Sequence, residues 1–242
     1  MCGRFAQSKM EDALVEEYGI TGTVPTSLLP ASWNIAPTKN IYIVRENQQT
    51  QARDLATASW GLIAPWAKNL ADARGSQSHA INARRESIFE KPTFREAIRK
   101  RRCIVPADGY YEWATAMGPY RPKQPFYISS SIAESLSFAG IWSEWVSPQG
   151  ELIQSAAVIT CEAVGQLAQI HSRMPVIVLR DCWQSWMDPS LADAGELRKL
   201  MEYSHIYDDL SVYPVSDAVN KVAHNVPELT EPVVLGEPQT LF

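Results

Sequence analysis

The sequence predicts a single α+β domain with a mainly antiparallel, partly barrel-like β-sheet and flanking helices. Stretches of β-forming residues outnumber helical patterns, and each is bounded by Pro, Gly, Asn or Asp. The strands do not alternate regularly with helices, which disfavours a doubly wound parallel sheet. The 242 residues, 45% of them hydrophobic, are enough for a substantial core.

We expect seven strands and four helical regions. The strands are predicted, in chain order, at residues 41–45, 57–63, 103–106, 125–129, 136–142, 153–161 and 175–179. Helices are predicted at residues 11–18, 86–100 and 164–169, and over a longer region at 181–203 that Asp188-Pro189 interrupts. No repeat or linker divides the chain, so residues 1–242 are expected to form one domain. Its Pro-rich, charged tail is predicted to be extended from about residue 219.

The chain shows no targeting or membrane segment. Its first 30 residues lack a basic start, an apolar stretch and a cleavage site, and no apolar run approaches the roughly 20 residues that span a bilayer. Four widely spaced cysteines without a C-x-x-C pair indicate neither a disulfide scaffold nor a zinc knuckle: Cys2, Cys103, Cys161 and Cys182. The sequence therefore predicts a soluble protein of a reducing compartment, either cytosolic or nuclear.

No metal or nucleotide cofactor is expected. No glycine-rich loop that would cradle a phosphate is present. The four histidines lack ligand spacing with one another or with the cysteines: His79, His171, His205 and His224.

Charge is distributed unevenly along the chain. The formal net charge is −5, yet residues 84–102 hold eight basic and three acidic side chains, so this segment carries +5 and the rest −10. A local positive surface on an acidic protein can bind phosphate groups. The same cluster is also typical of a solvated helix face, and the sequence leaves both readings open.

Cys2 is the most informative residue, because it directly follows the initiator methionine. Removal of Met1 would leave a thiol and an α-amine on one residue, with pKa values of about 8.5 and about 8. Such a pair reacts with an aldehyde in two steps: the amine forms a Schiff base, and the thiol closes a five-membered thiazolidine. The alternative is an accidental cysteine at a frayed terminus.

Three further polar residues are candidates for the same site. Asn82 lies between small apolar residues and can orient an amine or a sugar hydroxyl. Glu112 follows two tyrosines that could desolvate its carboxylate and raise its pKa, and His171 lies between a predicted helix and a predicted strand. Each alone has a structural explanation: a helix cap, a surface charge and a loop histidine.

Six motifs occur in an order that is typical of one protein family. They are MCGRF at 1–5, WNIAP at 33–37, WGLIAPW at 60–66, INAR at 81–84, CIVPADGYYEW at 103–113 and HSRMP at 171–175. In this ordered set the chain resembles the SOS response-associated peptidase (SRAP) family, which protects abasic sites in single-stranded DNA. The resemblance implies a DNA damage response enzyme that crosslinks covalently to the lesion through Cys2, without a cofactor. It would act as a monomer, in the cytoplasm or at the nucleoid of a bacterium, on single strands or at junctions with duplex DNA.

The resemblance also implies a role for each candidate. Cys2 would supply both nucleophiles, Asn82 would position the amine, Glu112 would transfer protons, and His171 would bind the sugar oxygen. A weak lyase side reaction would compete with closure of the thiazolidine. The residues that match DNA contacts of the family are Arg4, Asn34, Pro37, Trp66, Arg84, Thr160 and Arg173. One departure is that Trp66 is followed by Ala67 and a longer segment at 68–78, where the family often has a second tryptophan.

Two other functions remain open on the sequence. Cys2 could be the nucleophile of a peptidase or amidohydrolase, activated by its own α-amine, that removes Met1 or cleaves amides. The chain could also be a noncatalytic module that binds single strands and in which Cys2 is incidental. Capture of an aldehyde would leave a stable DNA adduct, whereas hydrolysis or simple binding would not.

Overall fold

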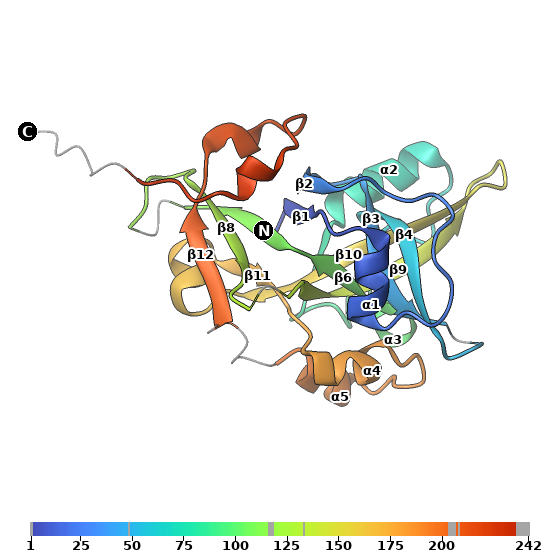
Figure 1. Ribbon diagram of the computed structural model, residues 1–242. Coiled ribbons are helices and arrows are strands. Elements are labelled where there is room, and N and C mark those ends of the chain that lie inside the picture. Colours follow the sequence, from blue (N-terminus) through green and yellow to red (C-terminus); the bar gives the residue numbers. More distant parts are fainter. Residues whose placement is uncertain are drawn as a thin grey trace, which may run out of the picture.

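Five strands of the computed structural model close into a barrel (Figure 1). They are β3 (Asn40–Glu46), β4 (Arg53–Trp60), β6 (Arg102–Ala107), β9 (Leu136–Val146) and β10 (Leu152–Glu162). The hydrogen-bonded order is β10-β4-β3-β6-β9, and β9 pairs again with β10 to complete the circuit. Among the neighbouring pairs of this barrel, β10 with β4 is the one parallel pair, and the other pairs are antiparallel. The structure describes residues 2–47, 49–115, 119–132, 134–202, 207 and 209–235.

A second, five-stranded sheet is antiparallel throughout and carries the N-terminal strand. Its order is β12 (Leu210–Pro214), β8 (Pro125–Ser130), β7 (Gly109–Trp113), β1 (Phe5–Gln7) and β2 (Ser32–Ile35). β7 and β8 can approach closely because the Tyr127 ring lies over Gly109, where any β-carbon would collide with it. β1 therefore lies inside the sheet, between β7 and β2.

β10 extends beyond the barrel and pairs there with two short strands. β5 (Asn82–Arg84) runs parallel to it, with Thr160 opposite Arg84, and β11 (Arg173–Pro175) runs antiparallel, with Thr160 opposite Pro175. Because paired residues share a face and side chains alternate along a strand, Arg84, Thr160 and Arg173 lie on one face of this extension.

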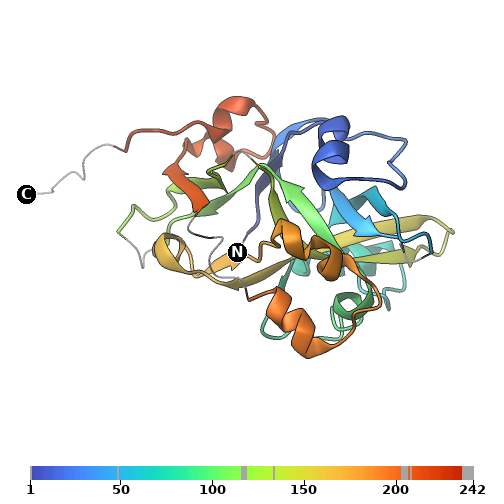
Figure 2. The ribbon, with the colours of Figure 1, turned by 60° about the horizontal axis from the view of Figure 1, so that its bottom comes forward.

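The helices are short and lie around the sheets. They are α1 (Glu11–Tyr18), α2 (Leu70–His79), α3 (Ala97–Lys100), α4 (Trp183–Met187) and α5 (Ala194–Leu200). The described residues also contain the 3₁₀ helices Gly165–Gln169, Arg180–Cys182, Asp217–Asn220 and Pro227–Thr230. In both Figure 1 and Figure 2, α4 and α5 lie away from the C-terminal segment, residues 217–235. None of the helices in the described ranges has the length and apolar composition that a membrane span requires.

The predicted fold class is confirmed, and most predicted elements are found. Helix 11–18 has the predicted bounds, and six of the seven predicted strands correspond to β3, β4, β6, β8, β9 and β10. The predicted strand at 175–179 is wrong: β11 ends at Pro175, and Ile177 makes a single bridge to Phe138. The predicted helix at 164–169 is a 3₁₀ helix.

Two helical predictions need correction. The predicted helix at 86–100 is reduced to α3, because the segment before it is a series of turns around Pro92, which has no backbone N–H to donate. The segment at 68–78, for which no helix was expected, contains most of α2; only Ala73 and Gln77 of this helix are buried, so its apolar pattern is weak. The region at 181–203 is broken after Met187, as Asp188-Pro189 predicted. Tyr203 lies outside the described residues.

The C-terminal tail folds back onto the second sheet as far as the structure describes it. Residues 217–235 contain two 3₁₀ helices, and Val215 bridges to Pro232. Val219 and Leu229 are buried in a small cluster with Tyr111 and Tyr127. Residues 236–242 lie outside the described part of the chain.

The basic segment ends in a buried arginine with a structural role. Arg102 is the first residue of β6, and its guanidinium donates to the carbonyls of Trp186 (2.6 Å), Ile98 (2.8 Å), Arg99 (2.8 Å) and Asp188. These carbonyls lie at the C-terminal ends of α3 and α4, where the helices leave acceptors without partners. Burial lowers the pKa of Arg102 to about 10, so it remains charged at neutral pH.

We predict that Arg102→Met lowers the free energy of unfolding by about 3 kcal/mol, because charged hydrogen bonds to buried carbonyls are lost. The exposed Arg95 provides the control, and Arg95→Met should change stability by less than about 0.5 kcal/mol. Urea unfolding followed by circular dichroism measures both. Equal stabilities of the two variants would contradict the assigned role of Arg102.

Candidate active site

Cys2 is buried at the end of the second sheet, and β1 keeps it there. Phe5, in β1, packs edge-on against Trp60 of the barrel, with 4.8 Å between ring centroids, and against Phe138 at 6.1 Å. Phe5 pairs with Tyr110 of β7 and is fully buried, so the chain cannot fray past it. Cys2 itself has 0% exposure. Cys2 is therefore held within the fold.

Asn82 holds the backbone of Cys2. Its Nδ2 atom donates to the Cys2 carbonyl at 2.8 Å, although the two residues are 80 positions apart. Asn82 begins β5, opposite Val158 of β10, and this pairing fixes the direction of its amide. Its Oδ1 atom is buried and has no hydrogen-bond partner in the described part of the chain. This oxygen can therefore accept a hydrogen bond from an amine or a hydroxyl.

Glu112 lies on β7, close to the Cys2 thiol. The residue is 4% exposed, and this burial raises the pKa of its carboxyl to about 7. Burial also raises the pKa of the Cys2 thiol, and the charge of Glu112 adds to that shift, whereas a hydrogen bond from the Arg4 backbone opposes it. Near neutral pH, Glu112 therefore exists in both protonation states beside a thiol that keeps its proton.

His171 completes the group of predicted residues. The Thr115 N–H, just after β7, donates to the Ile170 carbonyl at 2.9 Å and brings this loop to the end of β7. His171 Nδ1 accepts from the Arg173 N–H at 2.9 Å, and burial lowers the pKa of the imidazole, with the Arg173 charge acting in the same direction. The neutral ring therefore carries its proton on Nε2 and can donate it to an oxygen.

Chemically, the site combines a nucleophile with groups that can move protons and orient a polar substrate. It offers the Cys2 thiol, a carboxyl group with a pKa near 7, an amide oxygen with an unused acceptor position and a neutral imidazole. These are the components of covalent catalysis on an electrophilic carbon.

Arg4 lies beside the site and is held by two acceptors. Its Nη1 donates to Asn34 Oδ1 at 2.7 Å and to the Val219 carbonyl at 2.9 Å, and its guanidinium lies 5.8 Å from the Trp113 ring centroid. Trp113 Nε1 in turn donates to Asn220 Oδ1 at 2.8 Å. The C-terminal segment therefore helps to position a predicted phosphate-binding arginine.

Arg173 is engaged by a carboxylate as well as by β10. It forms a two-pronged ion pair with Glu86, with Nη1 2.9 Å from Oε1 and Nη2 3.0 Å from Oε2. Nη2 also donates to the Thr160 carbonyl at 2.7 Å, and Thr160 Oγ1 lies 3.3 Å away. Arg84, across β10, is exposed. The predicted cations Arg84 and Arg173 therefore flank one strand at the edge of the site.

The remaining predicted DNA contacts differ in accessibility. Trp66 is 57% exposed, and Pro37 is partly exposed. Thr160 is fully buried, and its carbonyl and hydroxyl hold Arg173. Asn34 is also buried; its Nδ2 lies within hydrogen-bond distance of the carbonyls of residues 219, 221 and 224, at 3.2, 3.1 and 2.6 Å. In this structure, Thr160 and Asn34 position neighbouring groups.

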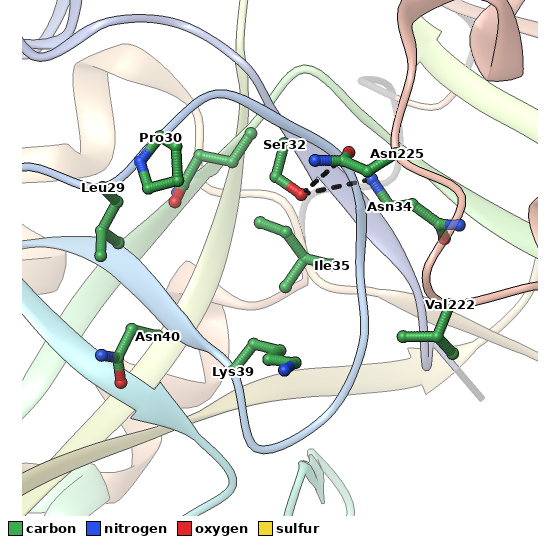
Figure 3. Close-up of a pocket in the computed structure, with 10 residues that line it drawn as sticks. Leu29, Pro30, Ser32, Asn34, Ile35, Lys39, Asn40, Val222 and Asn225 are labelled. Carbon is green, nitrogen blue, oxygen red and sulfur yellow. Dashed lines mark hydrogen bonds between the residues drawn. The ribbon is translucent and has the colours of Figure 1, made fainter.

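A groove of about 370 Å³ opens beside Asn34, between β2, the start of β3 and the C-terminal segment (Figure 3). Its walls include Leu29, Pro30 and Val222, and Lys39 lies at one side. Asn225 accepts hydrogen bonds from Ser32 Oγ at 3.3 Å and from the Trp33 N–H at 2.7 Å. Asn34 is the one predicted site residue among those lining this groove.

Sequence reasoning did not single out Glu86, Trp113 or Asn220, all of which contact predicted site residues. Glu86 was counted only as one acid in a basic segment; its place two residues after Arg84 is the signal that could have drawn attention to it. Asn220 lies in the segment that was expected to be extended, so no local pattern links it to Trp113.

The fold and the site together define an α+β protein whose buried cysteine at position 2 is surrounded by acid–base and basic side chains. The chain belongs to the SOS response associated peptidase (SRAP) family, whose model matches residues 1–222. The resemblance that the six motifs predicted is thus confirmed.

Relatives are known from bacteria and animals. The chain is 35% identical to the abasic site processing protein YoqW of Bacillus subtilis, over 96% of this chain and 99% of that protein. It is 29% identical to the abasic site processing protein HMCES of Rattus norvegicus, over 97% of this chain and 77% of that protein. A crystal structure of a Bacteroides thetaiotaomicron protein superposes with a TM-score of 0.84 at 27% identity, covering 96% and 100% of the two chains.

We predict that Asn34→Ala releases the C-terminal segment, because its amide is the shared donor for three backbone carbonyls. Amide hydrogen exchange at residues 217–235 should become faster, and the free energy of unfolding should fall by about 2 kcal/mol. Asn40→Ala is the matched control, since Asn40 lines the same groove and is exposed. Unchanged exchange in Asn34→Ala would rule out this anchoring role.

Glu112 should also make stability depend on pH. Its folded pKa of about 7 exceeds the ordinary value of 4.5, so its contribution is full below pH 4.5 and is lost as the pH rises through 7. The free energy of unfolding of the wild type, minus that of Glu112→Gln, should therefore fall by up to about 3 kcal/mol across this window. Urea unfolding over a pH series measures the difference, and a constant value would show that the carboxyl is not perturbed.

Proposed function

We propose that the protein crosslinks itself covalently to abasic sites in single-stranded DNA and so shields the lesion during the DNA damage response. The reacting residue is Cys2, after removal of Met1. The observation that carries the proposal is the buried Cys2, held at its carbonyl by Asn82 beside the Glu112 carboxyl, in a chain whose relatives are named abasic site processing proteins.

The chemistry follows from an amine and a thiol on one residue. An abasic deoxyribose in its open form has an aldehyde at C1′. The Cys2 α-amine adds to this carbon, and the resulting carbinolamine loses one water to form an imine. The thiol then adds across the C=N bond, with sulfur bonding to C1′ and the proton ending on nitrogen, which closes a thiazolidine ring.

Glu112 has the properties that the proton transfers require. A carboxyl group with a pKa near 7 is present as both acid and base at neutral pH. As an acid it protonates the hydroxyl that leaves from the carbinolamine. As a base it then accepts the proton of the Cys2 thiol, whose raised pKa keeps it neutral until that step. The same transfers in reverse would open the ring.

Asn82 and His171 orient the reactants. The unused Asn82 Oδ1 accepts a hydrogen bond from the Cys2 amine or from a sugar hydroxyl, while Nδ2 keeps hold of the Cys2 carbonyl. His171 donates from Nε2 to the sugar oxygen and stabilises charge on it during addition. The imine also acidifies the C2′ protons, so a weak lyase side reaction competes with attack by the thiol.

The DNA strand is proposed to follow the cations around the site. Arg4, Arg84 and Arg173 contact backbone phosphates, and the exposed Trp66 offers an aromatic face on which a base can stack. Cations gathered at this edge account for binding to a polyanion by a chain whose net charge is −5. The proposed partner is single-stranded DNA, alone or at a junction with duplex.

A peptidase is the second candidate, because the family description contains that activity. In that case the Cys2 α-amine would activate its own thiol for removal of Met1 or for cleavage of an amide bond. Both functions depend on Cys2. They differ in product, because hydrolysis of a peptide leaves no adduct on DNA.

We predict a denaturation-resistant adduct between the protein and a single-stranded oligonucleotide that carries one abasic site. On a denaturing gel, the shifted band should require the lesion and should be absent in Cys2→Ala. Cys182→Ala is the matched control and should crosslink as the wild type does, because Cys182 is a half-buried cysteine that is not among the site residues.

Borohydride separates the two steps of the reaction. The α-amine of processed Cys2→Ala can still form an imine, so reduction should trap an adduct with this variant. If Met1 is shown to be removed and the wild type still forms no adduct, the result would contradict the crosslinking proposal and favour the peptidase.

A further inference from the structure

Arg173 has two kinds of partner. The first is β10: Nη2 donates to the Thr160 carbonyl at 2.7 Å and lies 3.3 Å from Thr160 Oγ1. Thr160 is fully buried and also accepts from the Arg85 N–H at 2.9 Å, so it belongs to the rigid edge of the sheet. This contact ties the guanidinium to the sheet through an acceptor other than Glu86.

The second partner is exchangeable. The Glu86 side chain is 44% exposed, whereas that of Arg173 is 12% exposed. Its carboxylate covers the outer edge of the guanidinium through two bonds of 2.9 and 3.0 Å. The two-pronged geometry by which a carboxylate binds arginine is also the geometry by which a phosphate binds it. Glu86 therefore occupies the edge of Arg173 that an incoming phosphate would use.

The position of this ion pair is next to the site. Arg173 is two residues from His171, and its backbone N–H donates to His171 Nδ1. Glu86 is two residues beyond Arg84. Arg84 and Arg173 flank Thr160 on one face of the sheet. A strand that follows these cations would meet Glu86 directly.

We propose that Glu86 is an internal competitor for DNA, which a backbone phosphate displaces from Arg173 when a strand binds. The inference deepens the proposed function, on which its assignment of Arg173 to phosphate rests. Each binding event must break the ion pair, so noncovalent affinity is held down for every strand. Stability of a covalent adduct does not depend on this ion pair, so intact strands are released while a captured lesion is kept.

The test measures equilibrium binding to an intact single-stranded oligonucleotide by fluorescence anisotropy. Glu86→Gln keeps the shape of the side chain but removes its charge, and we expect about threefold to tenfold tighter binding. Glu90→Gln removes the same charge from an exposed residue of the same segment and should change Kd by less than about twofold. Glu86→Ala provides a second variant, and thermal unfolding verifies that both are folded. Unchanged or weaker binding by Glu86→Gln and Glu86→Ala would overturn the proposal.

A double-mutant cycle shows whether the effect passes through Arg173. In an Arg173→Gln background, the gain from Glu86→Gln should vanish, and a gain that persists would mean general repulsion and contradict the proposal. Because Glu86→Gln removes the negative charge that offsets Arg173, it should also steepen the slope of log K against log salt by up to about 0.7, the value for one more neutralised phosphate on a single strand.

Failure of this inference is distinguishable from failure of the proposed function. The binding assay uses an intact strand and needs no crosslink. Tighter binding by Glu86→Gln without any lesion adduct would leave the inference standing and remove the crosslinking function. A lesion adduct together with unchanged binding by Glu86→Gln would leave the crosslinking function standing and overturn the inference about Glu86.

Discussion

Burial of the N-terminal strand is the constraint on which the rest of the site depends. Chain termini are ordinarily frayed, because few contacts hold them. Here β1 is hydrogen-bonded on both edges, and Phe5 fills a space between the barrel and the second sheet against Trp60 and Phe138. Three residues before that anchor, Cys2 has little freedom, and Asn82 fixes its carbonyl. A group near the terminus thus gains the precise placement that the proposed reaction of Cys2 requires.

The same burial sets the protonation states around Cys2. Removing a group from water disfavours its charged form, which raises the pKa of the Cys2 thiol and of Glu112 and lowers that of His171. The result at neutral pH is a protonated thiol, a carboxyl group that exchanges its proton and a neutral imidazole. This combination suits a reaction in which an amine attacks first and protons move at each later step. The positive charges lie around the edge of the site, on Arg4, Arg84 and Arg173.

The sequence predicted those features that local patterns encode. Long strands and α1 have clear patterns, and Asn82, Glu112 and His171 lie in three of the motifs on which the resemblance to the family is based. Short strands such as β1 and β5 have only three residues each, too few for a periodicity, and they form because β7 and β10 offer them a partner. The prediction of a helix at 86–100 was wrong before α3, because Pro92 has no backbone N–H to donate within a helix. Contacts between distant segments, such as Trp113 with Asn220 or Asn34 with the C-terminal segment, arise from the tertiary fold and leave no local signal.

Mass spectrometry of the crosslinked peptide tests the central claim most directly. After reaction with an abasic oligonucleotide and digestion of both partners, the adduct should lie on the peptide that begins with Cys2, with Met1 absent. Its mass should equal peptide plus sugar fragment less one water, and borohydride should leave that mass unchanged, because a thiazolidine has no C=N bond to reduce. An adduct on another residue, or one that gains two hydrogens on reduction, would contradict ring closure by the α-amine and thiol of Cys2.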